Sequence, residues 1–313
     1  MRGDRVAVGG SLSARDLAGV DRLLDRAADA DGHPPLDEQH RVDLDAGRHE
    51  RLVPVLARRD RDPAGALTGY GHLLRAPDGW SVEVVVDPDA RDTGPPARAI
   101  LEATVAEVRQ RGGGRLRYWA PMATTRQDGD AAVVGLAPER DLLQLRVPLP
   151  LPPEVRDAPP PPGVALRPFR PGRDEAAWLA VNNRAFAGHP EQGGWDLAAV
   201  REREAQPWFH AAGFLLAEDA GHLAGFCWTK IHRDADPVLG EIYVIAVDPD
   251  HHRRGLGRVL AVAGLDHLAA GGVGVGMLYV DGDNEPALAL YRSLGFTVHH
   301  VDRAYAGEIP ADA

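Results

Sequence analysis

The sequence has very little cysteine: Cys227 is the only one in 313 residues. A single thiol can form neither an intrachain disulfide nor a zinc site built from several cysteines, and no serine-nucleophile motif occurs. Apolar runs stay well below the roughly 18–20 residues that a membrane-spanning helix needs, and the first five residues do not lead into a signal-peptide core. We therefore expect a cytoplasmic protein that does not span a membrane, with Cys227 as a small core residue.

Positive charge and lysine are also scarce. The chain has 46 acidic against 35 basic residues, a net charge of −11, and Lys230 is its only lysine. Such a chain is unsuited to nucleic acid or an anionic membrane as its main partner, although a local pocket can still bind phosphate. The His-His pairs at 251–252 and 299–300 lack the carboxylate spacing of a metal site, so we expect no metal.

Proline, in contrast, is concentrated in one stretch. The dense proline cluster between positions 148 and 163 is typical of a semi-rigid linker. A chain of this length is long for one core and suits two domains. We therefore divide it into an N-terminal domain of residues 1–147, a linker of residues 148–163 and a C-terminal domain of residues 164–313.

Hydrophobic periodicity indicates helices and strands in both halves. In the first half it predicts helices over residues 14–30 and 97–111 and strands over residues 51–58, 65–74, 82–86 and 116–120. In the second half it predicts the order strand, two helices, three strands, helix, strand, helix, strand. Alternating strands and helices of this kind favour an α/β architecture.

The most informative stretch runs from Gly240 to Arg258. Ile242 to Val247 form an unbroken apolar run typical of a buried strand, which Asp248-Pro249 ends because proline has no N–H group. Arg254-Gly255-Leu256-Gly257 then leads into a segment with helical spacing. Glycines at a helix start let backbone N–H groups approach an anion, and the helix dipole favours negative charge there. The stretch therefore predicts a phosphate-binding loop.

Two common kinds of phosphate site do not fit this loop. A Walker loop needs Lys followed by Ser or Thr where Arg258-Val259 stands, and a dinucleotide loop needs a third glycine where position 260 is Leu. The spacing His252-Arg253-Arg254-Gly255-Leu256-Gly257 instead resembles the pyrophosphate loop of the GNAT N-acetyltransferases, with the pattern Gln or Arg, two residues, Gly, one residue, Gly or Ala. His252 departs from that pattern. The predicted order of elements in the second half is also that of the family.

The two halves look like a degenerate repeat. Residues 80–89 match residues 241–250, a strand followed by Asp-Pro-Asp, and residues 131–136 match residues 291–296. The resemblance thus implies an α/β (α+β) fold of two tandem GNAT-type domains, each with a mixed central sheet flanked by helices. In the first half Trp80 and Ala131 stand where the second half has Glu241 and Tyr291, and Pro95 and Pro96 lie in the equivalent loop. We infer that the first half is not a second active site.

Acetyl transfer from a thioester to an amine needs a neutral amine, donors for the oxyanion and a stabilised thiolate. Glu241 opens the central strand, and we expect it to act as the general base, directly or through water. Tyr291 on the last helix is expected to protonate the thiolate. Backbone N–H groups of the segment Ile245-Ala246-Val247 are the expected oxyanion donors.

Several segments are more specific and resemble the mycothiol synthases. They are residues 181–195, 225–230, 278–280 and 291–296, and the run His-Pro-Glu-Gln-Gly-Gly-Trp at 189–195 is not part of the general GNAT pattern. The resemblance implies that acetyl-CoA acetylates the cysteinyl amine of Cys-GlcN-inositol (desacetylmycothiol), a small thiol pseudodisaccharide, to give mycothiol and CoA.

The same resemblance assigns roles residue by residue. It implies Glu241 as base, Tyr291 as acid, and substrate contacts at Glu38, Glu191, Lys230, Glu241 and Tyr279. It implies acetyl-CoA contacts at Ile245, Ala246, Val247, His252, Arg253, Arg254, Gly255, Leu256, Gly257, Arg258, Asn284, Glu285, Pro286, Ala287, Leu288 and Ala289. We expect a monomer.

Two other functions stay open at this point. Another small-amine N-acetyltransferase, for an aminoglycoside or a polyamine, would share the catalytic strand but not the segment from Glu191 to Trp195. A non-catalytic acetyl-CoA-binding sensor would need neither Glu241 nor Tyr291, both of which are present.

Overall fold

The chain forms two compact units, Met1–Leu142 with His300–Ala313 and Leu143–His299. The computed structural model describes residues 4–32, 34–45, 47, 51–59, 66–76, 79–91, 96–156, 159–188 and 192–312. No helix in these ranges is both long enough and apolar enough to cross a membrane.

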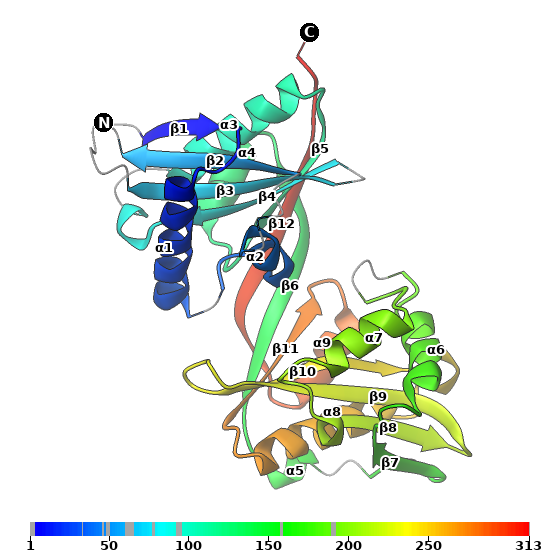
Figure 1. Ribbon diagram of the computed structural model, residues 1–313. Helices are drawn as coiled ribbons and strands as arrows, with labels where there is room; N and C mark the ends of the chain where they lie inside the picture. Colours follow the sequence, from blue (N-terminus) through cyan, green and yellow to red (C-terminus); the bar gives the residue numbers. More distant parts are fainter. Residues whose placement is uncertain are drawn as a thin grey trace. The chain divides into compact units, whose positions relative to one another are not determined.

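The first unit is a mixed sheet with helices on both faces (Figure 1). Its strands lie in the order β1-β2-β3-β4-β5, with β12 next to β5 and β6 next to β12. The pairs from β1 to β4 are antiparallel, β4 and β5 are parallel, and β5 and β12 are antiparallel. The elements in chain order are β1 (Asp4–Val8), α1 (Ala14–Asp31), α2 (Glu38–Asp45), β2 (Leu52–Arg59), β3 (Leu67–Ala76), β4 (Gly79–Val86), η1 (Pro88–Ala90), α3 (Pro96–Gln110), β5 (Gly114–Ala120), α4 (Thr125–Val133) and β6 (Ala137–Pro148).

Strand alternation gives this sheet two apolar faces, because successive side chains point to opposite sides. Val55 and Val82 pack in the cluster that includes α3, whereas Leu56 and Val85 pack in the cluster that includes α1. Ser13 and Asp16 form a reciprocal capping box that fixes the start of helix α1. The strand β1 was not among the elements predicted from the sequence.

The second unit repeats the same plan. Its strands lie in the order β6-β11-β10-β9-β8-β7. Pairs from β7 to β10 are antiparallel, and β10 and β11 are parallel. Its elements are α5 (Pro153–Arg156), β7 (Val164–Pro168), α6 (Glu175–Ala185), α7 (Leu197–Glu204), η2 (Ala211–Gly213), β8 (Phe214–Asp219), β9 (His222–His232), β10 (Leu239–Val247), η3 (Pro249–His251), α8 (Leu256–Ala270), β11 (Val275–Asp281) and α9 (Glu285–Ser293). The last strand, β12 (Thr297–Ile309), follows α9.

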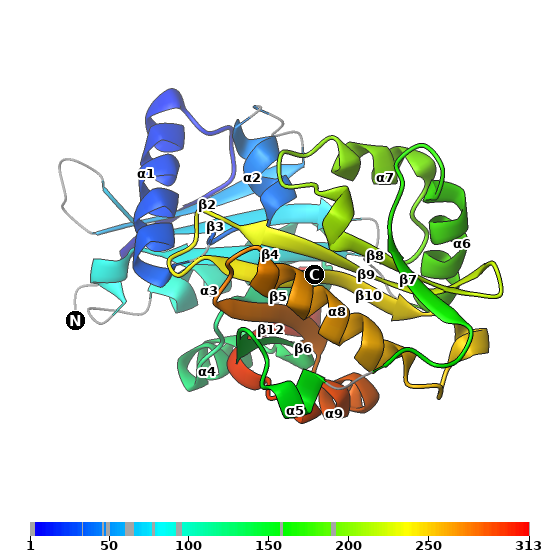
Figure 2. The same cartoon turned by 90° about the horizontal axis from the view of Figure 1, so that it is seen from below.

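Two cores cover the two faces of this second sheet. One core joins α8 and α9 to the sheet through residues such as Leu260, Leu265 and Leu288, and Figure 2 shows α8 lying across β9 and β10. The other core, on the α6 and α7 side, is aromatic and centres on Trp178 and Trp228, both fully buried. Gly264 allows α8 to pack closely against β9, because a Cβ atom at this position would lie 2.5 Å from the Cys227 Sγ atom.

The proline-rich segment that we expected to be a linker is packed where the structure describes it. The backbone N–H of Leu149 donates a hydrogen bond to the Gly274 carbonyl oxygen at 2.9 Å, and Leu151 is 2% exposed. Leu149 and Val155 pack against the core that contains α8. The apolar residues interleaved with the prolines explain this packing.

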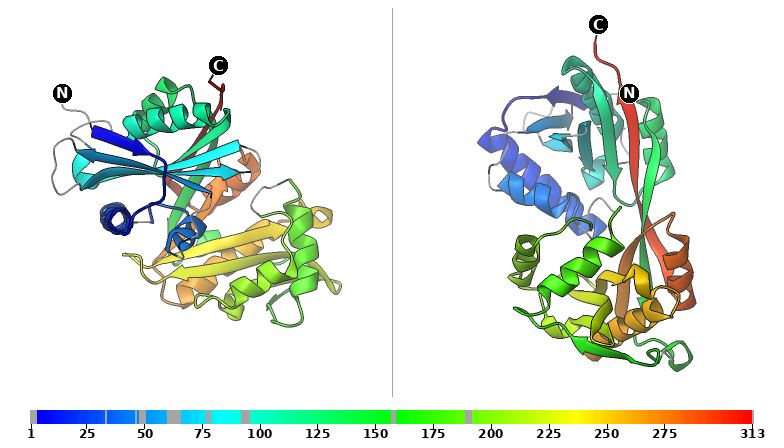
Figure 3. Two further views of the ribbon diagram at one scale, coloured as in Figure 1. Left: turned by 45° about the horizontal axis from the view of Figure 1, so that its top comes forward. Right: turned by 90° about the vertical axis from the view of Figure 1, so that its right-hand side faces the viewer.

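The last strand, β12, joins the first unit for most of its length. Its residues from Arg303 to Ile309 pair antiparallel with β5, from Ala120 to Gly114. β12 (red) and β6 (green) lie side by side in the right-hand view of Figure 3. The division into units therefore differs from the expected boundaries, because residues 300–313 belong with the N-terminal part of the chain.

Candidate active site

The central strand β10 separates from its parallel neighbour partway along its length. Pairing with β11 covers only Leu239↔Val275, Gly240↔Gly276 and Glu241↔Met277. Beyond Glu241, β10 stays paired with β9 as far as Val247↔Gly225. Residues 242–247 therefore do not pair with β11, and the backbone groups on this side of β10 are available to a ligand.

A β-bulge lies in the middle of this strand. Ile242 pairs with Thr229, but the next pair is Val244 with Trp228, so Tyr243 is the additional residue. The bulge shifts the alternation of side chains. As a result Ile242, Ile245 and Val247 all pack on the α8 side, whereas Val244 packs on the aromatic side.

Glu241 lies just before the bulge, where β10 and β11 begin to separate. Directly paired residues share a face of the sheet, as do residues two apart on one strand. Lys230 is paired with Glu241 on β9, Met277 is paired with it on β11, and Tyr279 follows Met277 by two residues. Glu241, Lys230 and Tyr279 therefore lie on one face, with Glu241 8% exposed and Tyr279 40% exposed.

Aromatic rings hold the ammonium group of Lys230. Its Nζ atom lies 4.7 Å from the ring centre of Trp208 and 5.6 Å from that of Tyr243. Contacts of this kind stabilise a cation through the negative face of the ring. They fix the position of the single lysine on the same face as Glu241. Tyr279 is held in turn by a 2.7 Å hydrogen bond from the Gln144 side chain.

A tight turn connects β10 to α8. The Asp248 side chain accepts from the backbone N–H of Asp250 at 3.0 Å and ends the strand. Arg253 and Gly255 have positive φ angles of 63° and 80°, and Gly255 is the N-cap of α8. The first N–H groups of a helix have no intrahelical acceptor, so this turn presents backbone donors at a positive helix end.

The side chains of the turn are already engaged within the protein. His252 Nε2 lies 3.0 Å from the Val247 carbonyl oxygen, Arg254 pairs with Asp219 at 2.5 Å, and Arg258 donates to Ser293 at 2.9 Å. These contacts brace the loop. Backbone N–H groups at the start of α8 therefore remain as donors of this loop, and His252, which departs from the family pattern, contacts the Val247 carbonyl oxygen.

The helix α9 carries Tyr291 on the opposite side of the sheet from Glu241. The Asn284 side chain accepts from the Ala287 N–H at 3.2 Å and starts this helix. Tyr291 is 6% exposed and packs with the α8 core, its ring edge-on to Phe296. Burial, with a smaller contribution from Cys227, raises the Tyr291 pKa well above its ordinary value. The unpaired side of β10 lies between the faces that carry Glu241 and Tyr291.

Two expected substrate contacts cannot be placed. Glu191 lies outside the described residues, and for Glu38 only the backbone at the start of α2 is described. Of the first-half loop, residues 92–95 also lie outside them. The structure therefore brings together Glu241, Lys230 and Tyr279 and leaves the positions of the other two contacts as predictions.

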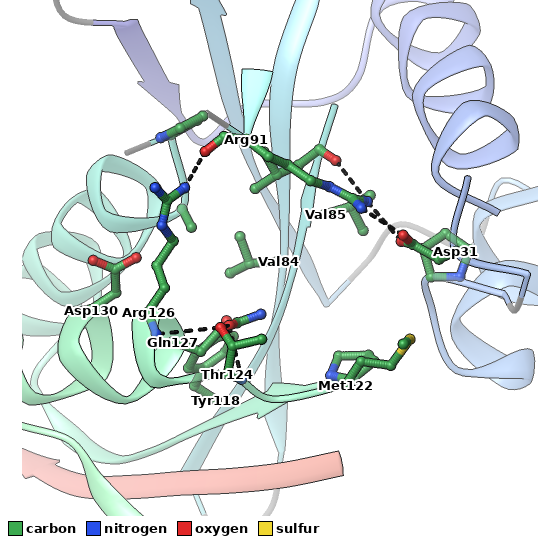
Figure 4. Close-up of a pocket in the computed structure, with 15 residues that line it drawn as sticks. Asp31, Val84, Val85, Arg91, Tyr118, Met122, Thr124, Arg126, Gln127 and Asp130 are labelled. Atoms are coloured by element: carbon green, nitrogen blue, oxygen red, sulfur yellow. Dashed lines mark hydrogen bonds and ion pairs between the residues drawn. The ribbon is translucent and has the colours of Figure 1, made fainter. Parts of the chain in front are cut away.

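The first unit has a cavity where β4 and β5 separate. Their pairing ends at Glu83↔Trp119, and a cavity of about 330 Å³ lies beyond it, lined by residues such as Val84, Val86 and Tyr118 (Figure 4). An ion pair between Arg91 and Asp31, at 2.6 Å, stands at its edge.

The acid and base positions of this first unit are filled by core residues. Trp80 is 5% exposed and donates to the Gly113 carbonyl, and Ala131 is fully buried. Strand β4 also pairs with β3 without a register shift, so it lacks the bulge of β10. These contacts give Trp80 and Ala131 structural roles.

Among the residues that the structure describes, no group of three or more His, Cys, Asp or Glu side chains could hold a metal ion. Cys227 is fully buried, and burial raises its pKa to about 12. A thiol with so high a pKa is a poor nucleophile near neutral pH.

Sequence reasoning missed His232 and Trp208. His232 follows Lys230 by two residues on β9, and its Nε2 atom lies 2.7 Å from the Glu241 Oε2 atom. The period of two would have placed it beside Lys230. Trp208 lies in a loop, and no local pattern connects it to Lys230.

Comparison with known proteins identifies relatives over almost the whole chain. The pattern of the Acetyltransferase (GNAT) family matches residues 178–296. The chain is 47% identical over 304 residues to a mycothiol acetyltransferase of Thermomonospora curvata, covering 96% of each chain. It is 43% identical over 306 residues to a mycothiol acetyltransferase of Acidimicrobium ferrooxidans, again covering 96% of each.

Solved structures confirm the fold class. A GCN5-related N-acetyltransferase from Sphaerobacter thermophilus superposes with a TM-score of 0.68 at 24% identity, covering 100% of this chain and 98% of that one. A tandem GNAT protein from the clavulanic acid biosynthesis pathway also gives 0.68, at 17% identity, covering 99% and 100%. At these identities the likeness speaks for the fold alone, which is the predicted pair of tandem domains with mixed sheets.

Proposed function

Because the chain belongs to the mycothiol acetyltransferase family of GNAT enzymes, we propose that it transfers the acetyl group of acetyl-CoA to the cysteinyl amine of Cys-GlcN-inositol. The products are mycothiol and CoA. The observation that carries this proposal is the grouping of Glu241, Lys230 and Tyr279 on one face, where β10 and β11 separate. The opening between the strands would take the thioester, and this face would take the acceptor.

Glu241 is the base in this proposal. An α-amine has an ordinary pKa near 8, so only a modest driving force is needed to remove its proton near neutral pH. Glu241 is buried, with 8% of the residue exposed, and lies at the mouth of the opening. The nitrogen then attacks the thioester carbonyl, and the oxyanion is stabilised by backbone N–H groups of residues 245–247 that face away from β9.

Lys230 and Tyr279 bind the acceptor. Both are polar at their tips and share the Glu241 face, and Lys230 keeps its ammonium group against the Trp208 and Tyr243 rings. Donors and acceptors of this kind match the hydroxyl groups of a pseudodisaccharide. Glu38 and Glu191 complete the contact set that we predict from the sequence.

Acetyl-CoA binds along the unpaired side of β10, with its pyrophosphate at the start of α8. The positive φ of Gly255 turns the chain there, and a Cβ at this position would meet nothing within 4 Å, so the surface above the turn is open. Residues 284–289 at the start of α9 lie on the same α8 side as Tyr291 and contribute the remaining contacts.

Tyr291 donates a proton or a hydrogen bond to the departing thiolate. A tyrosine with an ordinary pKa of about 10 is already a weaker acid than a thiol near 8.5. Burial raises the Tyr291 pKa further, which makes complete transfer less favourable. We therefore propose that Tyr291 contributes less to the rate than Glu241.

Our remaining expectations about the protein in the cell rest on the sequence. We propose that it acts in the cytoplasm as a monomer, without a nucleic-acid or membrane partner and without a metal. The substrate is a small molecule.

The test is to separate CoA and mycothiol chromatographically after incubating the protein with acetyl-CoA and Cys-GlcN-inositol. We expect turnover that falls by about 10²-fold or more in Glu241→Gln, as for a lost general base. The matched control is Glu102→Gln, at an exposed position of α3. A panel of aminoglycosides and polyamines runs in parallel. Faster acetylation of one of those amines, or tight acetyl-CoA binding without turnover on any amine, would refute the assignment.

A further inference from the structure

The general base has a neighbour that the sequence did not reveal. His232 Nε2 lies 2.7 Å from Glu241 Oε2. The two residues come from adjacent strands, since His232 pairs with Leu239 and Glu241 pairs with Lys230, so they meet diagonally on one face of the sheet. Diagonal neighbours of this kind are within reach of long side chains.

The carboxylate of Glu241 depends on this contact for its orientation. The structure gives it no second hydrogen-bond partner among the described residues, and its side chain is 11% exposed. Lys230, which pairs with Glu241 across the two strands, has its ammonium group over the Trp208 and Tyr243 rings. The imidazole is thus the group that fixes the torsion about the last bond of the Glu241 side chain.

The direction of the hydrogen bond follows from the chemistry of the two groups. An ionised carboxylate can only accept, so the imidazole nitrogen that faces it must carry a hydrogen. His232 Nε2–H therefore donates to Oε2. The other oxygen, Oε1, is left for the proton that Glu241 has to receive.

We propose that His232 is the positioning residue of the general base: its hydrogen bond to Oε2 holds Glu241 so that Oε1 faces the attacking amine. This inference rests on the proposed role of Glu241 in acetyl transfer. His232 touches neither substrate nor thioester in this scheme and acts through Glu241. Its side chain is 31% exposed, so its loss need not disturb the core.

The experiment compares His232→Phe, which keeps a ring but has no donor, with His232→Gln, which keeps an N–H donor. We expect His232→Phe to lower kcat roughly 10- to 10²-fold, the scale of a misplaced reacting group, with the KM for acetyl-CoA unchanged. His232→Gln should recover most of that loss. His222→Phe, at the exposed start of the same strand, is the matched control and should behave as wild type.

Two kinetic results would overturn the proposal. The first is a wild-type kcat in His232→Phe. The second is equal loss in His232→Phe and His232→Gln, which indicates a structural role of the ring. If the wild-type protein does not acetylate Cys-GlcN-inositol, the proposed function fails on its own, and a readout without substrate decides about His232.

That readout is the ¹⁵N NMR spectrum of the His232 imidazole, assigned by its loss in His232→Phe. We expect a protonated Nε2 whose shift moves in Glu241→Ala. An unprotonated Nε2, or a shift that does not respond to Glu241→Ala, would refute the hydrogen bond itself.

Discussion

Two glycines at the start of α8, its N-cap Gly255 and Gly257 in its first turn, should respond oppositely to substitution by alanine. Gly255 has a φ of 80°, whereas Gly257 lies inside the first turn of α8. A Cβ at Gly255 would meet nothing within 4 Å, and one at Gly257 would lie 3.5 Å from Leu290, an ordinary contact. Backbone conformation, rather than space, therefore separates Gly255→Ala from Gly257→Ala.

The magnitudes follow from that difference. Holding alanine in the left-handed region costs roughly 1–2 kcal/mol, and the smaller entropy of the unfolded chain offsets about 0.4–1 kcal/mol of it. Gly255→Ala should thus lower the free energy of unfolding by about 1 kcal/mol. Gly257→Ala should raise it by about 0.5–1 kcal/mol, the usual advantage of alanine within a helix.

Thermal unfolding measures the gap. For a unit of this size about 1 kcal/mol corresponds to roughly 2–4 °C, so the Tm values of the two variants should differ by roughly 3–8 °C. Acetyl-CoA affinity, followed by isothermal titration calorimetry, should fall in Gly255→Ala by roughly fivefold if about 1 kcal/mol of strain moves the loop. Gly257→Ala should bind as wild type.

Equal Tm values for the two variants would refute this reasoning. So would a loss of affinity in Gly257→Ala as large as that in Gly255→Ala, because the expected cost arises from the positive φ of Gly255 and not from the added methyl group.

Three further results should follow from buried groups. Tyr291→Phe keeps the buried ring, so it should leave Tm within a degree or two of wild type. It should lower kcat less than Glu241→Gln does, near the lower end of the range of about 10²–10⁴ for loss of a general acid or base. A larger loss of kcat than in Glu241→Gln would contradict the minor role of the acid. Cys227, whose pKa burial raises to about 12, should resist a thiol reagent in the native protein at pH 8 and react once in denaturant; native labelling would show that β9 opens. Burial acts to raise the Asp248 pKa, but hydrogen bonds from Arg184 and a backbone N–H hold it below its ordinary value. A lowered carboxyl pKa stabilises the fold above the unfolded value of about 4, and this stabilisation disappears as pH falls through the folded pKa. Urea unfolding of Arg184→Gln should therefore show lower stability than wild type at pH 7 and a smaller difference near pH 3, and a constant difference would contradict the linkage.

Local patterns were sufficient to predict much of the second unit. The run from Ile242 to Val247, the Asp-Pro stop and the glycines that follow are all features of neighbouring residues, and the helix expected after Arg254-Gly255-Leu256-Gly257 is α8, which begins at Leu256. Tyr291, expected on the last helix, lies in α9, whose N-cap is Asn284. Short-range rules suffice there because helix caps and strand ends depend on a few adjacent residues.

Features that depend on distant partners were missed. Strand β1 alternates half-buried and exposed residues at an edge of the sheet, so its sequence carries a weak signal. The bulge at Tyr243 exists only relative to β9. The contact of His232 with Glu241 likewise requires the register of two strands, which no single segment encodes.

The pairing of β12 with β5 has a consequence for how the chain is made. Residues 303–309 are synthesised after β11, yet they complete the sheet whose other members lie before residue 149. Until they leave the ribosome, β5 presents an unpaired edge, and unpaired edges invite pairing with other chains. Strands β7 to β11 all precede β12 in the chain and pair without it. The sheet whose strands emerge first is therefore completed only after the strands of the second unit have been made.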